Sequence, residues 1–106
     1  MKTAYVITAD GDEQWELVAE KNGLGVTETP NGFFSVTHLN TGRKIGLCSF
    51  LTEAGARGFM ESIADIYPWT ELKENFEKGQ QPLLAKKVRA NFELWQANED
   101  TNEDHP

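Results

Sequence analysis

Hydrophobic and polar residues change their spacing near the middle of the chain. Up to residue 50 they form short runs in which apolar and polar positions tend to alternate, as in half-buried β-strands. Beyond residue 52 the apolar positions recur every three or four residues, as on one face of an α-helix. The sequence therefore predicts strands first and helices afterwards.

The first three predicted strands are separated by dipeptides that suit tight hairpin turns. In chain order these segments are 4–8, Asp10-Gly11, 14–20, Asn22-Gly23 and 24–28. The middle run fits either a helical turn or a strand with Trp15, Leu17 and Ala19 on one face, and we favour the strand. A turn cluster at 29–32 then precedes a new element.

The clearest element is a hairpin of residues 33–39 and 43–50 around a turn at 40–42. Its favoured register places Val36 opposite Leu47, Phe34 opposite Ser49 and His38 opposite Ile45. One face is then apolar, with Phe34, Val36, Ile45 and Leu47. The reverse face carries Ser35, Thr37, Lys44 and Cys48, as expected for an antiparallel sheet covered on one side.

Three helices are expected after this hairpin. The first follows the N-cap Thr52 and carries the apolar positions Ala56, Phe59, Met60, Ile63 and Tyr67 up to Pro68. A second, shorter one has Trp69, Leu72 and Phe76 on one side and runs to Gly79. Pro82 opens the third, whose apolar stripe is Leu84, Val88, Phe92 and Trp95. Gly55 and Gly58 lie inside the first helix and indicate either a helix that begins later than Thr52 or, as we favour, close packing against another element.

This order of elements predicts an α+β fold. We expect an N-terminal antiparallel β-meander of four or five strands, covered on one face by about three C-terminal helices, in a single domain over residues 1–98. Residues 99–106 are acidic and lack apolar side chains, so we expect a disordered tail there. The order of the strands in the sheet is left open.

Composition and charge narrow the class of protein. The 106 residues are 39% hydrophobic and 25% charged, which is ordinary for a globular protein. Seventeen acids against ten bases give a net charge of -7, which disfavours non-specific attraction to phosphate backbones. Cys48 has no second cysteine to pair with, and the N-terminal apolar run is too short for a signal peptide or a membrane span. We therefore expect a cytoplasmic protein with no membrane partner.

Residues that could carry catalysis or bind a metal are sparse. The histidines are His38 and His105, and neither lies at metal-ligand spacing from Cys48. His38 and Cys48 project from opposite faces of the predicted hairpin, which disfavours a Cys-His dyad. The sequence thus predicts a protein that is not an enzyme and holds no cofactor or metal. Carboxylates acting in an unseen cleft are the less favoured, enzymatic alternative.

Aromatic residues are numerous, with three Trp, two Tyr and six Phe, and this favours binding to another protein. We expect anchors at Trp15, Phe33, Phe50 and Trp69, and steering charge from Glu13, Glu71, Glu74 and Glu77. The leading hypothesis is a small acidic module that docks on another macromolecule, as an inhibitor or adaptor of a basic, nucleic-acid-binding protein, for example a phage or plasmid anti-defence protein. Two plainer interpretations stay open: the aromatics form a second core layer or a homodimer seam, and the acids only keep the protein soluble.

The basic residues support an alternative hypothesis. Arg43 and Lys44 lie beside the hairpin turn, and Lys86, Lys87 and Arg89 lie in the last predicted helix. These side chains suit phosphate contacts in a nucleic-acid-binding or transcription-regulatory protein, and a dimer would double the patch. The acids of residues 1–30 oppose this hypothesis, because they would repel a duplex.

Overall fold

The computed structural model describes residues 2–71 and 82–103, and at 47, 48 and 98–103 it describes the backbone alone. Its elements are β1 (Thr3–Thr8), β2 (Gly11–Lys21), β3 (Leu24–Glu28), β4 (Phe34–His38), β5 (Arg43–Phe50), α1 (Glu53–Ala64) and α2 (Pro82–Glu103). The strands form one antiparallel sheet in the order β1-β2-β3-β4-β5. The predicted α+β fold with an N-terminal meander is confirmed.

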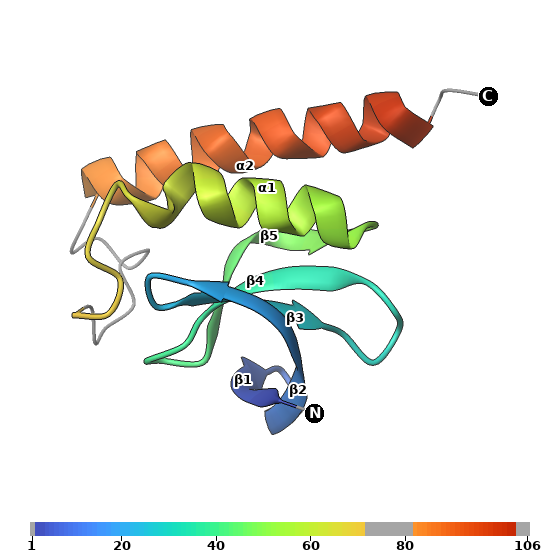
Figure 1. Ribbon diagram of the computed structural model, residues 1–106, viewed down its shortest axis with the longest axis vertical. Helices are drawn as coiled ribbons and strands as arrows, with labels where there is room; N and C mark the ends of the chain where they lie inside the picture. The colour runs from blue at the N-terminus through green and yellow to red at the C-terminus, as the bar shows by residue number, and fades with distance from the viewer. Residues whose placement is uncertain (1, 72–81, 104–106) are drawn as a thin grey trace.

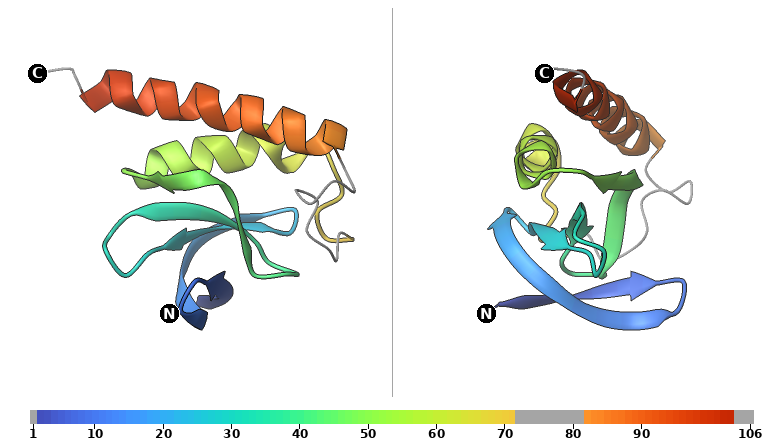
Figure 2. Two further views of the ribbon diagram at one scale, coloured as in Figure 1. Left: turned by 180° about the vertical axis from the view of Figure 1, so that it is seen from behind. Right: turned by 90° about the vertical axis from the view of Figure 1, so that its right-hand side faces the viewer.

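The helices cover one face of a curled sheet (Figure 1). α1 lies against the sheet, and α2 lies beside α1 and β5. The β1–β2 hairpin folds back on the opposite side, as the end-on view in Figure 2 shows. Its position is fixed by a hydrogen bond of 2.8 Å from the amide of Ile7 to the carbonyl oxygen of Gly42, just before β5. The two ends of the meander therefore approach each other.

A bulge in β2 makes this curl possible. Leu17 pairs with Thr27, but Ala19 pairs with Val26, so Val18 is an extra residue in the ladder. An extra residue bends the strand and reverses which face the following side chains occupy. The prediction that Trp15, Leu17 and Ala19 share one face is therefore wrong for Ala19, which lies on the face of Val26.

The predicted register of the second hairpin is also wrong. The structure pairs Val36 with Ile45, His38 with Arg43 and Phe34 with Phe50, with a register shift between the first and last of these pairs. Gly46 lies within the shifted segment at φ 103°, a conformation that glycine adopts without steric cost and that accompanies bulges. The shared face of Val36 and Ile45 is as predicted, and the shift turns Phe50 inward, where it is 1% exposed.

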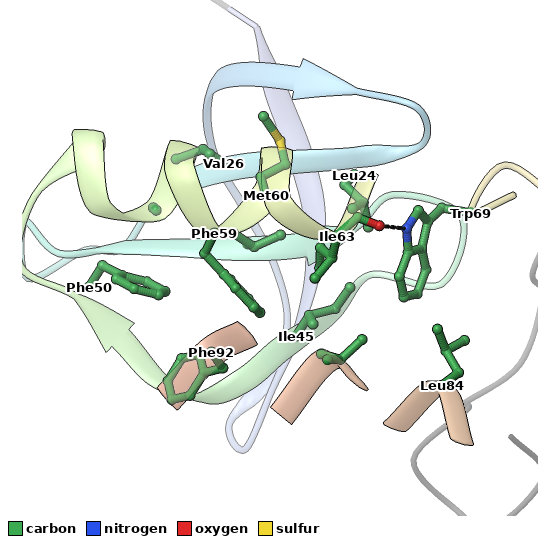
Figure 3. Packing of buried hydrophobic residues seen from close by; sticks show 13 residues of the cluster. Leu24, Val26, Ile45, Phe50, Phe59, Met60, Ile63, Trp69, Leu84 and Phe92 are labelled. Carbon is green, nitrogen blue, oxygen red and sulfur yellow. Dashed lines mark hydrogen bonds between the residues drawn. The ribbon is translucent and has the colours of Figure 1, made fainter. Parts of the chain in front are cut away.

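The main hydrophobic core lies between the sheet and the helices (Figure 3). It contains Leu24, Val26, Val36, Ile45 and Phe50 from the strands, Ala56, Phe59, Met60 and Ile63 from α1, Leu84, Val88 and Phe92 from α2, and Trp69. The rings of Phe50, Phe59 and Phe92 form a triangle with centroids 5.4–5.6 Å apart. The apolar stripes predicted for the two long helices thus meet in one core.

The start of α1 is as predicted, and the element that packs closely against it at Gly58 is α2. The hydroxyl oxygen of Thr52 accepts a hydrogen bond of 3.0 Å from the amide of Gly55, which makes it the N-cap. A Cβ atom on Gly58 would overlap the ring of Trp95, so this glycine lets the two helices approach closely. α1 ends at Ala64, earlier than the predicted end near Pro68, and the side-chain amide of Asn22 donates to the Ala64 carbonyl oxygen.

Two helices are found in the described ranges, where about three were predicted. Residues 69–71 form turns, and the rest of the expected second helix, with Leu72, Phe76 and Gly79, lies outside the described residues. α2 begins at Pro82 as predicted but continues to Glu103, so residues 99–103 are helical where a disordered tail was expected. No Gly or Pro follows Pro82 before residue 106, and each further residue of an unbroken helix adds one backbone hydrogen bond.

Candidate docking surfaces

The structure buries most of the predicted aromatic anchors. Phe33 is 41% exposed, but Trp15 is 8%, Phe50 1% and Trp69 0% exposed. The expectation that these last three lie at the surface is corrected. Trp15 belongs to the β1–β2 hairpin and its ring lies under the ammonium of Lys44, the β5 bulge turns Phe50 into the main core, and Trp69 packs beyond the end of α1.

Trp69 is held by hydrogen bonds at both its ring and its backbone. Its indole nitrogen donates to the carbonyl oxygen of Ile63 at 2.8 Å, and its own carbonyl oxygen lies 2.7 Å from Nε2 of His38. Because a carbonyl oxygen can only accept, Nε2 carries the proton, and in the neutral ring Nδ1 accepts from the Thr41 hydroxyl at 2.8 Å. Both ring nitrogens of His38 are thus engaged in holding the fold together.

Around Trp15 the structure brings together Glu13 and Lys44, which the sequence assigned to competing binding surfaces. The indole nitrogen donates to the Glu13 carboxylate at 2.8 Å, and the Thr8 hydroxyl donates to its other oxygen at 3.3 Å. The ammonium of Lys44 lies 5.6 Å from the centre of the Trp15 ring, in a cation–π contact. Glu13 is therefore committed to local contacts and is less available for steering a partner.

The other predicted steering acids, Glu71, Glu74 and Glu77, follow α1 in the chain. Glu71 is exposed, and its amide donates to the Pro68 carbonyl oxygen at 3.0 Å. Glu74 and Glu77 lie outside the described residues. The structure therefore locates one exposed carboxylate of the three predicted here.

A pair of acids that the sequence analysis did not single out lies directly across two strands. Glu16 in β2 is the register partner of Glu28 in β3, and Glu28 is in turn the partner of Phe34 in β4. All three side chains are half-buried and share one face. Within the described residues neither glutamate forms an ion pair. Two like charges are thus held side by side with no cation between them in that part of the chain.

Exposed apolar side chains lie at the same end of the sheet. Phe34 pairs with Phe50, and the residues just outside this pair, Phe33 and Leu51, are each 41% exposed. The turn before Phe33 is well fixed, because the amide and carbonyl of Phe33 both bond to Thr29, at 3.1 and 2.8 Å. We call Glu16, Glu28, Phe33, Phe34 and Leu51 together the sheet-end surface.

The five predicted basic residues lie on two elements that pack together. Gly46 of β5 contacts Phe92 of α2, and the side chain of Gln96 donates to the Ser49 carbonyl oxygen at 3.3 Å. From the first contact to the second, the residue numbers rise in both elements, so β5 and α2 run in the same direction. The first residues of β5 therefore lie toward the beginning of α2. Arg43 and Lys44 at the start of β5 and Lys86, Lys87 and Arg89 in the first half of α2 are all exposed.

Tyr5 lies beside the start of β5. Its ring packs on Gly42, where a Cβ atom would overlap it. A hydrogen bond to Asp12, together with partial desolvation and the negative charge of Asp12, raises the pKa of Tyr5, while the positive charge of Arg43 opposes the increase. The tyrosine therefore stays neutral and able to donate to Asp12 further into the alkaline range.

Comparisons of this chain with protein-family models, with curated proteins and with solved structures found no match. Within the described ranges, no group of three or more His, Cys, Asp or Glu side chains is placed to hold a metal ion. No helix among residues 2–71 and 82–103 is long and apolar enough to cross a membrane. The geometry of the surfaces is therefore the basis for a functional assignment.

Proposed function

We propose that this protein is a non-enzymatic binding module that docks on another protein through the sheet-end surface. The observation that carries the proposal is the direct pairing of Glu16 with Glu28. Like charges in opposed positions of an antiparallel pair destabilise it, by about 0.2–1 kcal/mol on the scale of cross-strand pairs. A basic group of a partner placed between the two carboxylates would turn this local repulsion into attraction.

The chemistry of the surface defines the kind of partner. The carboxylates require a basic group, and the exposed Phe33 and Leu51 require apolar contacts next to it. Phe33 and Phe34 are consecutive, so their side chains point to opposite faces of the sheet. A partner that contacts both must therefore reach around the end of the sheet. An inhibitor or adaptor of a basic, nucleic-acid-binding protein fits this description, and a phage or plasmid anti-defence protein is one example.

The charge around the surface supports the same partner. Residues 1–30, which contain β1, β2 and β3, carry six acids and two bases, a net charge of -4. A field of one sign increases the rate at which an oppositely charged protein arrives. Association with a basic partner should therefore slow as salt concentration rises.

The test compares the wild type with a Glu16→Gln/Glu28→Gln variant and a matched Glu61→Gln/Asp65→Asn control. Glu61 and Asp65 are exposed on or just after α1, so the control loses the same charge at another place. Each tagged protein is used to capture partners from nuclease-treated lysate of the source cells, followed by quantitative mass spectrometry. We expect proteins that the wild type and the control retain and the sheet-end variant loses. Identical captured proteins for all three would contradict the proposal.

A second candidate function, nucleic-acid binding, rests on the packing of β5 against α2. Arg43 and Lys44 begin β5, and the basic residues Lys86, Lys87 and Arg89 lie in the first half of α2, the helix that packs on β5. The test is fluorescence anisotropy with labelled duplex and single-stranded probes across a salt series. Binding that falls steeply with salt and is lost in a Lys86→Glu/Lys87→Glu variant would favour this function. No binding at low salt would exclude it.

A further inference from the structure

α2 carries a second apolar stripe on the side away from the core. Its buried residues Leu84, Val88 and Phe92 face the sheet and α1. Leu83 and Leu94 are 76% and 59% exposed, and they alternate with the exposed Ala90 and Ala97. The spacings of seven, four and three residues place these four side chains, here called the outer stripe, along one line of the helix. Figure 1 shows α2 as the outermost layer, extending past α1.

The charges of α2 are divided between its two halves. Residues 82–92 contain Lys86, Lys87 and Arg89 and no acid, whereas residues 93–103 contain Glu93, Glu99, Asp100 and Glu103 and no base. The first turn has no acidic residue and the last turn no basic one. This order is the reverse of what the helix macrodipole favours, because its positive end is at the N-terminus.

We propose that the outer stripe is an interface between two copies of this chain, with their α2 helices packed antiparallel. An antiparallel copy places the acidic half of each helix along the basic half of the other. It also opposes the two macrodipoles, so both unfavourable features of the isolated helix are compensated. A two-fold register with Ala90 opposite Leu94 of the second copy sets a small side chain against a large one, as close helix packing requires.

The first test measures the mass of the full chain in solution by sedimentation equilibrium after nuclease treatment. We expect a dimer for the wild type. For a Leu94→Ser variant we expect the dissociation constant of the dimer to rise about tenfold or more, while the fold is kept because Leu94 is exposed. Circular dichroism checks that fold. A Leu51→Ser variant removes an exposed leucine from the sheet-end surface and should remain dimeric. A wild-type monomer at every concentration, or an unchanged dimer in Leu94→Ser, would overturn the proposal.

The second test determines the orientation, in a Cys48→Ser background. In the antiparallel register, the two copies of residue 90 lie near the two-fold axis, and those of residue 83 lie roughly 27 Å apart along the helices. A short bis-maleimide should therefore crosslink the Ala90→Cys variant and fail with Leu83→Cys. Efficient crosslinking at residue 83 would indicate a parallel pair and would refute the antiparallel arrangement.

The third test addresses the charges. Lys86→Glu/Lys87→Glu leaves Arg89 as the one base in residues 82–92, so that both halves of α2 are acidic. The dissociation constant of the dimer should then rise about tenfold or more. Lys2→Glu/Lys21→Glu changes the net charge equally, just before β1 and at the end of β2, and should leave the dimer intact. Equal weakening by the two double variants would refute charge pairing along α2. Because the outer stripe and the sheet-end surface share no residue, loss of the dimer and loss of the partner are separate results.

Discussion

His38 donates from Nε2 to the carbonyl oxygen of Trp69, 2.7 Å away and 31 residues further along the chain. The bond joins the end of β4 to the segment that leaves α1, and Trp69 is fully buried against the core there. A histidine that the sequence marks as a possible chemical group thus serves to satisfy a backbone carbonyl. The same contact explains why Trp69 cannot act as an exposed anchor without opening the fold.

Replacing this histidine should therefore destabilise the protein strongly. His38→Ala leaves the Trp69 carbonyl without its donor and leaves a cavity where the imidazole, 2% exposed, was buried. We expect the free energy of unfolding to fall by about 2–4 kcal/mol. Thr41→Val removes the partner of Nδ1 and the acceptor of the Arg43 amide, 3.3 Å away, and should cost about 1–2 kcal/mol. Urea unfolding followed by tryptophan fluorescence measures both. Equal losses for the two variants would show that the carbonyl bond is not the dominant contact.

Gly58 gives a second prediction, because two effects of opposite sign compete there. Alanine is favoured over glycine in a helix interior by about 1 kcal/mol. A Cβ atom on residue 58 would overlap the Trp95 ring, and overpacking costs about 1–3 kcal/mol. We expect the clash to win, so that Gly58→Ala lowers the free energy of unfolding in chemical denaturation.

A double-mutant cycle separates these two effects. In a Trp95→Leu background the ring is gone, and Gly58→Ala should become neutral or stabilising. If Gly58→Ala is equally destabilising in both backgrounds, the cause is not the contact with Trp95.

How far the sequence predicts the fold follows from the range of the interactions involved. The five strands, the N-cap at Thr52 and the start of α2 at Pro82 depend on neighbouring residues, and all are found where the local pattern places them. The bulges in β2 and β5 depend instead on how the whole sheet curls, which involves contacts between residues far apart in the sequence. Gly46 inside a predicted strand was the available signal for the second bulge, since glycine in a strand often marks one.

The candidate surface was harder to predict for the same reason. Phe50 and Trp69 are buried by a register shift and by a contact from distant His38, neither of which alternation can reveal. The pairing of Glu16 with Glu28 requires the register of β2 and β3 across the Val18 bulge. Phe33 was identified because alternation along the hairpin puts it on the face opposite Phe34 and Val36, and it is 41% exposed.

Tyr5 provides a prediction about pH. Its hydrogen bond to Asp12 raises its pKa in the folded protein, so the unfolded chain loses this proton first as pH rises. The contribution of Tyr5 to stability is therefore fully present below the ordinary tyrosine pKa of about 10 and is lost as pH rises through the higher folded value. Asp12→Asn should lower the pKa of Tyr5, as measured by absorbance titration of tyrosinate. A Tyr5→Phe variant identifies which of the two tyrosines titrates.

The paired carboxylates of the sheet-end surface lead to the last prediction, which concerns stability without any partner. Glu16→Gln or Glu28→Gln alone removes the repulsion between the two strands, and each should raise the free energy of unfolding by about 0.2–1 kcal/mol. The double variant should gain little beyond either single one, because a single substitution already ends the repulsion. The gain should shrink at high salt, since salt screens charges at partly exposed sites.

The opposite sign would be equally informative. A loss of stability in both single variants would mean that the two carboxylates accept favourable contacts in the free protein, and the argument for a basic partner would lose its physical basis. A gain in stability combined with lost partner capture would show that these two acids oppose folding and serve binding. The measurement is therefore best made on the same purified variants that are used for capture, in urea unfolding at low and high salt.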